Sequence, residues 1–146
     1  LVLKDLAQSV GCFSENMAIV TAEDYHFWIK LAQKGVKMSF IREILGQYRV
    51  HSGNQSGSVY RHLKSVICVV DEFFLAKGSH GLKETLRIRR RYGLAYYGAA
   101  RAMQRTGKLF EAWPLLLRAI LYSPFFIKNY AAIAIGLIYT AKNWRN

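Results

Sequence analysis

Apolar residues recur at helical spacing along most of the chain. The first run, residues 2–10, predicts a short helix that stops at Gly11. A second run begins after the capping-box pattern Thr21-Ala22-Glu23-Asp24 and continues to Lys34, where Gly35 favours a helix end. Four longer runs follow, and they predict helices at about 60–77, 82–106, 109–122 and 124–144.

Two stretches between these helices have a different pattern. β-Branched and aromatic residues alternate with polar ones over 38–42 and again over 44–51, which predicts two short strands. The small polar residues of 52–58 then predict a loop, and we place a domain boundary there. The expected fold is therefore α+β and mostly helical, with a mixed α/β segment at 1–58 followed by an all-helical region at 59–146.

The composition is that of a folded chain with a strongly basic second half. Hydrophobic residues make up 52% of the 146 residues, which excludes disorder. The net charge is +12, and residues 60–146 supply +11 of it through fifteen Lys or Arg against four Asp or Glu. Such a charge is typical of proteins that bind nucleic acid or an anionic membrane. The two cysteines form no disulfide framework and the chain starts with no secretory leader, so we expect a cytoplasmic protein.

The helix after Thr21 carries the most informative chemistry. At about 100° per residue, its apolar face is formed by Phe27, Trp28, Leu31 and Ala32. Asp24 projects onto the middle of this face and Glu23 onto its edge, whereas His26 lies on the opposite, solvated side. A carboxylate among apolar side chains is costly unless it is capped, paired or used in chemistry. Asp24 therefore either completes the cap of the helix or acts as a general base towards a substrate hydroxyl.

A basic pair closes the second predicted strand. Alternation places Arg49 and His51 on one side of that strand, and a loop rich in hydroxyl groups and glycine, which includes Ser56, follows. A cation beside an imidazole suits a phosphate or a metal–phosphate group. An exposed strand end without a ligand is the alternative.

Several of these motifs occur together and in a fixed order. They are Gly11-Cys12-Phe13-Ser14-Glu15, the segment from Ala22-Glu23-Asp24 to Trp28-Ile29-Lys30-Leu31-Ala32, Gly35, Ile44-Leu45-Gly46-Gln47-Tyr48-Arg49-Val50-His51 and Ser56. This set resembles the second half of the catalytic domain of glycosyltransferase family 2, the bacterial GT-A-fold enzymes of cell-surface polysaccharide synthesis. The resemblance covers about residues 1–58. Cys12, Ser14 and His26 depart from the family pattern, which has glycine, Asp and an acidic residue there.

The resemblance implies a role for each matching residue. Asp24 would be the catalytic base that deprotonates the acceptor hydroxyl in an inverting displacement. Acceptor binding would fall to Glu23, Gly11 and Trp28. The divalent metal or the diphosphate of the nucleotide-sugar would be held by His51, Arg49 and Ser56. An alcohol becomes a good nucleophile only when a base takes its proton, so these roles form a consistent set.

The implied protein is the acceptor-side part of a glycosyltransferase, an enzyme of the hexosyltransferase type. Its substrates would be a nucleotide-sugar donor and a saccharide or lipid-linked acceptor, and the full-length enzyme would use the divalent metal Mg²⁺ or Mn²⁺. The family's Asp-x-Asp motif and N-terminal nucleotide-binding half do not occur in this sequence. We therefore expect a C-terminal portion that binds no metal and transfers no sugar by itself.

The basic region carries a repeat-like signal. Its small and aromatic residues have the spacing of one tetratricopeptide-like hairpin, at about 93–126: Tyr96, Ala100, Gly107, Ala112, Ala119 and Pro124. A plain helical hairpin fits the same spacing. One such repeat cannot bury its own apolar face, so we expect it to pack against the neighbouring helices.

A dense run of arginines lies in the same region: Arg87, Arg89, Arg90 and Arg91. It is either a solvated helix face or a contact for an anionic membrane surface. The last helix is apolar nearly all round but shorter than the roughly 20 apolar residues of a membrane span, so we expect peripheral contact with the inner face of the cell membrane. A basic nucleic-acid-binding module or a protein adaptor is the alternative function. Nucleic acid is disfavoured because the sequence has no known nucleic-acid-binding motif.

Overall fold

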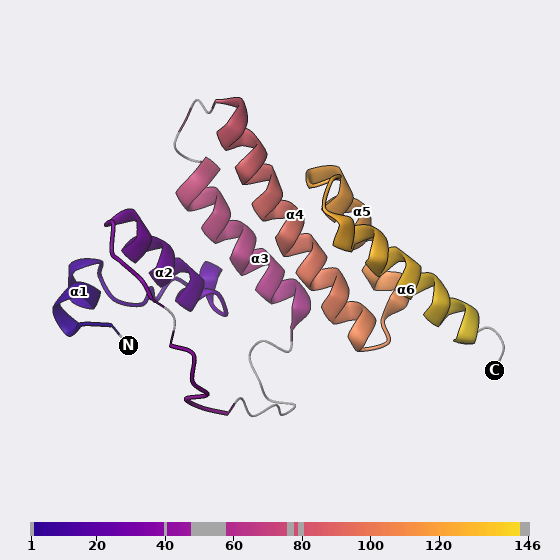
Figure 1. Cartoon of the computed structure of the whole chain (residues 1–146), viewed down its shortest axis with the longest axis horizontal. Helices are drawn as coiled ribbons and strands as arrows, with labels where there is room; N and C mark the ends of the chain where they lie inside the picture. Colours follow the sequence, from indigo (N-terminus) through magenta and orange to yellow (C-terminus); the bar gives the residue numbers. More distant parts are fainter. Residues whose placement is uncertain (1, 40, 48–57, 76–77, 79–80, 144–146) are drawn as a thin grey trace. The chain divides into compact units, whose positions relative to one another are not determined.

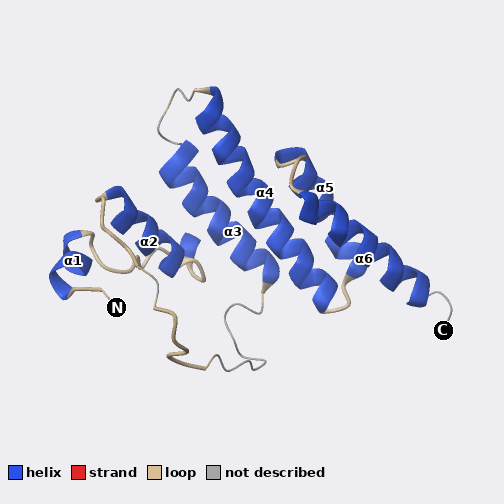
Figure 2. Ribbon diagram, viewed as in Figure 1, coloured by secondary structure: helices blue, strands red, loops and turns tan. Residues whose placement is uncertain are grey.

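The structure is a computed structural model that describes residues 2–39, 41–47, 58–75, 78 and 81–143. The chain forms two compact units, Leu1–Ser65 and Val66–Asn146. Throughout the described ranges the regular elements are helices (Figures 1 and 2). The predicted boundary loop falls mostly outside these ranges, so the assignment of 1–58 and 59–146 to separate domains stays a prediction.

Two helices of the first unit form where the sequence predicts them. α1 (Lys4–Ser9) ends shortly before Gly11, whose φ of 73° lies in the left-handed region that favours glycine. α2 (Glu23–Gln33) is followed by Gly35, whose N–H donates to the carbonyl of Ala32 (3.0 Å). Such a bond satisfies a carbonyl that the last helical turn leaves free, and it explains why α2 ends there.

The start of α2 differs from the predicted capping box. The N-cap residue is Ala22, and its side chain makes no capping hydrogen bond. Thr21 instead takes a φ of 84°, and its carbonyl accepts a hydrogen bond from Nδ1 of His62 (2.9 Å) in α3 (Val59–Val70). A β-branched residue is strained at this φ, so the bond from His62 fixes a conformation that Thr21 would otherwise avoid. The predicted Thr21 cap is therefore wrong.

The apolar core of the first unit is supplied by the 3₁₀ turn η1 (Met17–Ile19), by α2 and by the first turns of α3. Its buried apolar residues are Ile19, Ala22, Phe27, Ile29, Leu31 and Leu63. The hydroxyl of Ser65 donates to the carbonyl of Val20 (2.6 Å), which ties the chain before α2 to α3. This core positions α2, the helix that carries the candidate site.

Neither predicted strand is present in the described residues, so the expected α+β class, with its GT-A segment, is wrong for the part of the chain that the structure describes. Residues 38, 39 and 41–47 are irregular and exposed, and 48–51 lie outside the described residues. A strand is stable only when a second strand shares its backbone hydrogen bonds. The sequence alternation of 38–47 is real, but no described segment pairs with it. Apolar side chains such as Ile44 consequently remain in solvent (95% exposed).

The second unit consists of helices that follow the predicted runs. A π-helix, η3 (Asp71–Leu75), continues α3, and α4 (Leu82–Arg105), α5 (Leu109–Tyr122) and α6 (Ile127–Asn143) come after it. α4 and α5 form a hairpin, and α6 packs on both of them (Figure 1). The sequence therefore predicted the helices of this region to within a few residues, except for the π-helix.

The hairpin of α4 and α5 has a closely packed seam. Four residues of the predicted repeat are buried in it: Tyr96, Ala100, Ala112 and Ala119. Gly107, with a φ of 78°, makes the turn between the two helices. A Cβ atom at Gly93 would come within 2.6 Å of the Cβ of Ser123, just after α5. The assignment of this hairpin to the tetratricopeptide repeats stays a prediction.

Candidate functional site

α2 presents one exposed face that carries an acid and an aromatic side chain. Asp24, Trp28 and Ala32 are spaced four residues apart, so they lie in one row along the helix, and all three are exposed. The buried side chains of α2 occupy its other faces: His26, Phe27, Ile29 and Leu31. The candidate site thus has Asp24 in the first turn of α2 and Trp28 one turn later.

This arrangement corrects the predicted orientation of α2. Trp28 and Ala32 are predicted inside but are exposed, Trp28 by 44%, whereas His26, predicted on the solvated side, is only 5% exposed. Helical periodicity identifies a face, but the segments that pack against the helix decide which face is buried. Asp24 lies in solvent and carries no burial cost. Asp24 remains a candidate site residue because it is exposed on the same face of α2 as Trp28.

The carboxylate of Asp24 sits at the start of a helix. Its Oδ1 atom accepts a hydrogen bond from the N–H of Tyr25 (2.6 Å), and the free N–H groups of a first turn favour negative charge there. The predicted alternative, in which Asp24 completes the cap of Thr21, is not formed because Thr21 is not the N-cap residue.

A row of aromatic rings fixes the indole of Trp28. The rings of Phe27 and Trp28 meet edge to face with centroids 5.6 Å apart, and Phe27 also contacts Phe13 at 4.6 Å. Contacts of this kind add to the stabilisation that burial alone provides. The Trp28 ring is therefore held at the surface of α2 before any ligand binds.

The loop at Gly11 lies against α2. The Lys30 ammonium donates a hydrogen bond to the carbonyl of Cys12 (3.0 Å), and the ring of Phe13 lies on that of Phe27. Cys12 has a φ of 49°, the left-handed conformation for which glycine is the usual residue. The structure thus brings the predicted acceptor residue Gly11 next to the helix of Trp28.

Glu23 turns one carboxylate oxygen inward. Its Oε2 atom is buried and has no hydrogen-bond partner. Glu23 shares a row of α2 with Phe27 and Lys30, the two residues that hold the Gly11 loop. A buried polar atom without a partner is costly, and this oxygen of Glu23 is closed to solvent.

The predicted metal and diphosphate residues His51, Arg49 and Ser56 lie outside the described residues. In the ranges that the structure describes, no group of three or more His, Cys, Asp or Glu side chains is placed to hold a metal ion. The metal and diphosphate roles of His51, Arg49 and Ser56, and the Mg²⁺ or Mn²⁺ of the full-length enzyme, therefore stay predictions.

The arginines of the predicted cationic run point to different sides of α4. Arg89 donates a hydrogen bond to a backbone carbonyl of α5 (2.7 Å), and the guanidinium of Arg91 lies over the ring of Phe74 (4.1 Å). All four arginines are exposed, and two of them, Arg89 and Arg91, also contact other parts of the second unit. The role of this run as a membrane or anion contact stays a prediction.

Sequence reasoning missed a set of polar contacts in the second unit. The hydroxyl of Tyr92 in α4 donates to the carboxylate of Asp71 in η3. Burial and this carboxylate raise the pKa of Tyr92 above its ordinary value. In α5, the guanidinium of Arg118 lies over the ring of Tyr96 (5.6 Å). Arg118 is the single charged residue of the apolar run 112–122, and this is the sequence signal that could have drawn attention to it.

Comparisons with known proteins give no relative. No family model and no curated protein matches the sequence, and no solved structure matches the fold. Within the part of the chain that the structure describes, no helix is both long and apolar enough to cross a bilayer.

Proposed function

We propose that the exposed face of α2 is the acceptor-binding surface of a glycosyltransferase, which moves a sugar from a nucleotide-sugar to a saccharide or lipid-linked acceptor. The supporting observation is that Asp24 and Trp28 are exposed together, one turn apart on the same face. The order of motifs in residues 1–58 supports the transferase class. In this proposal Trp28 receives the apolar face of a sugar ring, and Asp24 receives the hydroxyl to which the sugar is transferred.

The spacing of these two groups suits a saccharide. A sugar ring has an apolar C–H face, which packs on an aromatic ring, and hydroxyl groups at its edge, which donate hydrogen bonds. Asp24 and Trp28 are four residues apart, which is a rise of about 6 Å along the helix axis. In this proposal a single bound sugar unit contacts both side chains.

The carboxylate of Asp24 also accounts for the chemistry of the acceptor. The acceptor oxygen attacks the anomeric carbon of the donor, the bond from that carbon to the diphosphate breaks, and the hydroxyl proton passes to the carboxylate. Asp24 is exposed at the start of α2, where an incoming hydroxyl group can reach it.

Two neighbouring features support the same surface. Glu23 directly precedes Asp24 in the first turn of α2, and the resemblance implies that Glu23 binds the acceptor. The Gly11 loop is tied to α2 through Lys30 and borders the aromatic row that ends at Trp28. Glu23 and the Gly11 loop are thus the groups that would orient the acceptor.

Tryptophan fluorescence of the 146-residue chain tests the proposal. The chain has three tryptophans, so Trp113→Phe with Trp144→Phe leaves Trp28 as the single reporter. We expect a saturable change in Trp28 emission on titration with hexoses, N-acetylhexosamines and their disaccharides. Asp24→Asn should weaken this binding about tenfold, because a hydrogen bond to a charged group is lost.

Asp5→Asn is the matched control, since Asp5 is an exposed acid in the first turn of α1. It should leave saccharide binding unchanged. The proposal is wrong if no saccharide changes the Trp28 emission, or if Asp5→Asn weakens binding as much as Asp24→Asn.

A further inference from the structure

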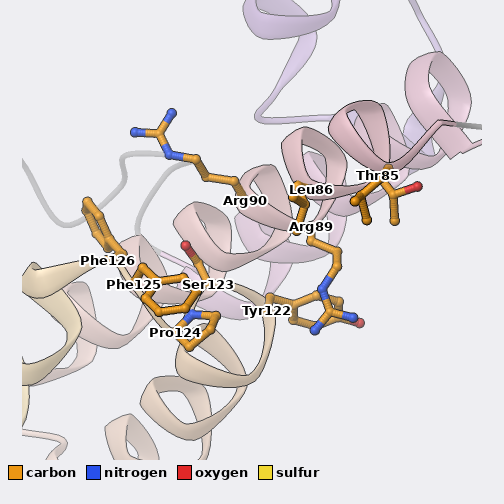
Figure 3. A pocket seen from close by; sticks show the side chains of 10 residues that line it. Thr85, Leu86, Arg89, Arg90, Tyr122, Ser123, Pro124, Phe125 and Phe126 are labelled. Carbon is orange, nitrogen blue, oxygen red and sulfur yellow. The ribbon is translucent and has the colours of Figure 1, made fainter.

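Two adjoining cavities of the second unit share Arg89 and Tyr122 as lining residues. The smaller one, of about 490 Å³, lies between α4 and α5 and is also lined by Tyr96, Arg118 and Leu121. The larger one, of about 700 Å³, lies between the start of α4 and the turn from α5 to α6 (Figure 3). No carboxylate lines either cavity in these described segments.

The smaller cavity holds two guanidinium groups over a pair of stacked tyrosines. The rings of Tyr96 and Tyr122 are nearly parallel, with an angle of 8° and centroids 5.6 Å apart. Arg118 lies over Tyr96 at 5.6 Å and Arg89 over Tyr122 at 5.9 Å. Arg89 also donates to the carbonyl of Leu121 (2.7 Å). The two cations are therefore positioned by contacts with the protein.

Two cations at one cavity repel each other, and an anion between them removes that repulsion. The planar guanidinium group matches phosphate oxygens with two parallel hydrogen bonds. Each arginine has five N–H donors, and Arg89 uses one of them for the carbonyl of Leu121. The smaller cavity is thus suited to a phosphate group.

The larger cavity is mainly apolar and opens to solvent. Leu82 and Leu86 of α4 and Phe125 of the α5–α6 turn line it, and all three are exposed, Phe125 by 95%. Figure 3 shows Arg89 turned towards Tyr122 and Arg90 extending away from it. Exposed apolar side chains beside cations are typical of surfaces that bind a lipid.

We propose that the two cavities together bind an anionic phospholipid, with its phosphate at Arg89 and Arg118 and its acyl chain along Leu82, Leu86 and Phe125. Charge selects this occupant over a neutral lipid, because residues 66–146 hold thirteen Lys or Arg against four Asp or Glu. Arg90 at the rim adds attraction for the headgroup. This site belongs to the second unit and does not depend on the proposed acceptor surface of α2.

Titration calorimetry with soluble short-chain lipids tests the site in the 146-residue chain. The probes are dihexanoyl phosphatidic acid, dihexanoyl phosphatidylcholine and inorganic phosphate. We expect phosphatidic acid to bind at least tenfold more tightly than either of the others, because it alone offers both the doubly charged phosphate and the chain. Equal affinity for inorganic phosphate, or for the neutral lipid, would overturn the proposal.

Matched variants locate the binding. Arg118→Gln should weaken the binding of phosphatidic acid about tenfold. Arg90→Gln changes an exposed residue at the rim and should weaken the binding about threefold. Arg87→Gln makes the same charge change at an exposed position of α4 that lines neither cavity and should have no effect.

A second pair of variants tests the larger, apolar cavity. Phe125→Ser should weaken the binding of phosphatidic acid about tenfold. Phe110→Ser, which changes an equally exposed phenylalanine (86%) that lines neither cavity, should not. A comparable loss in Arg87→Gln or Phe110→Ser would show nonspecific attraction to a basic, apolar surface and would contradict the site.

Discussion

Gly93 is the glycine, among those described in the second unit, at which an added side chain would have the least room. An added Cβ atom would lie 2.6 Å from the Cβ of Ser123 and 3.3 Å from the carbonyl oxygen of Ala119. Because a backbone atom cannot move aside as a side chain can, Gly93→Ala should lower the free energy of unfolding by about 1–2 kcal/mol. Urea denaturation followed by circular dichroism measures this change.

Gly98 is the matched control, because it lies in the same helix and an added Cβ would meet nothing within 4 Å. Gly98→Ala should raise the free energy of unfolding by about 0.5–1 kcal/mol, since alanine favours the helix. Equal stability of the two variants would contradict the close approach of α4 to the end of α5.

Individual residues of α2 show what a sequence pattern can and cannot predict. The pattern correctly predicted a helix that ends at Gly35. It placed Trp28 inside and His26 outside, and both placements are wrong. Apolar character alone favours burial of Trp28, but the Gly11 loop packs against Phe27 and Lys30, and His26 is buried while Trp28 is exposed. Contacts between segments distant in the sequence determine which face of α2 is buried, and the local pattern does not predict those contacts.

At the scale of elements, the hydrogen bond between Tyr92 and Asp71 joins α4 to the π-helix η3. Burial and the Asp71 carboxylate raise the pKa of the Tyr92 hydroxyl. The folded state therefore holds the Tyr92 proton more tightly than the unfolded state does. The tighter binding of this proton adds to the free energy of unfolding. The added stability is complete below the unfolded pKa of about 10 and is lost as the pH rises above that value. Chemical denaturation at several pH values should show a decline in stability above pH 10, of which Tyr92 supplies a part.

The variant Tyr92→Phe measures how much of the decline in stability above pH 10 comes from Tyr92. The variant should be about 1.5 kcal/mol less stable at neutral pH, because Asp71 loses its donor, and its stability should decline less steeply above pH 10. Tyr97→Phe removes a hydroxyl from a tyrosine of the same helix whose ring packs on Phe126, and it should keep the full decline. Parallel pH profiles for the wild type and Tyr92→Phe would show that the Tyr92–Asp71 bond is not formed in solution.

The elements of the second unit were largely predictable because their signals are local. Gly107 and the apolar period fix the ends of α4 and α5, and the structure places these ends within a residue of the prediction. The π-helix has no such signal, since its extra residue per turn depends on contacts such as that of Asp71 with α4. The predicted strands are absent from the described residues 38, 39 and 41–47 for a related reason: an alternating pattern forms a strand only where a partner strand is present.

At the scale of the whole molecule, the net charge of +12 sets the response to salt. Like charges repel in the compact state, and dissolved ions screen that repulsion. We expect 0.5 M NaCl, relative to about 0.02 M, to raise the melting temperature by about 3 °C, which corresponds to about 1 kcal/mol. Differential scanning fluorimetry measures the shift. A melting temperature that fell with added NaCl would show that ion pairs outweigh repulsion.

The candidate site was only partly predictable at this scale. Asp24, Glu23 and Trp28 lie on one short helix, so their proximity follows from the sequence. That the Gly11 loop meets this helix depends on contacts between Phe13 and Phe27 and between Lys30 and Cys12. Those contacts join residues more than ten positions apart, and no local pattern specifies them. The cavities at Arg89 are formed by α4, α5 and the turn that follows α5, and they were not predictable from any one of these segments.

The left-handed turn at Cys12 has a practical consequence. Its thiol is exposed, whereas the second cysteine, Cys68, is partly covered. A maleimide dye added in slight deficit should therefore label mainly the turn beside α2. The attached fluorophore would sit next to the Phe13–Phe27 contact and would report on events at this edge of the first unit without any engineered substitution.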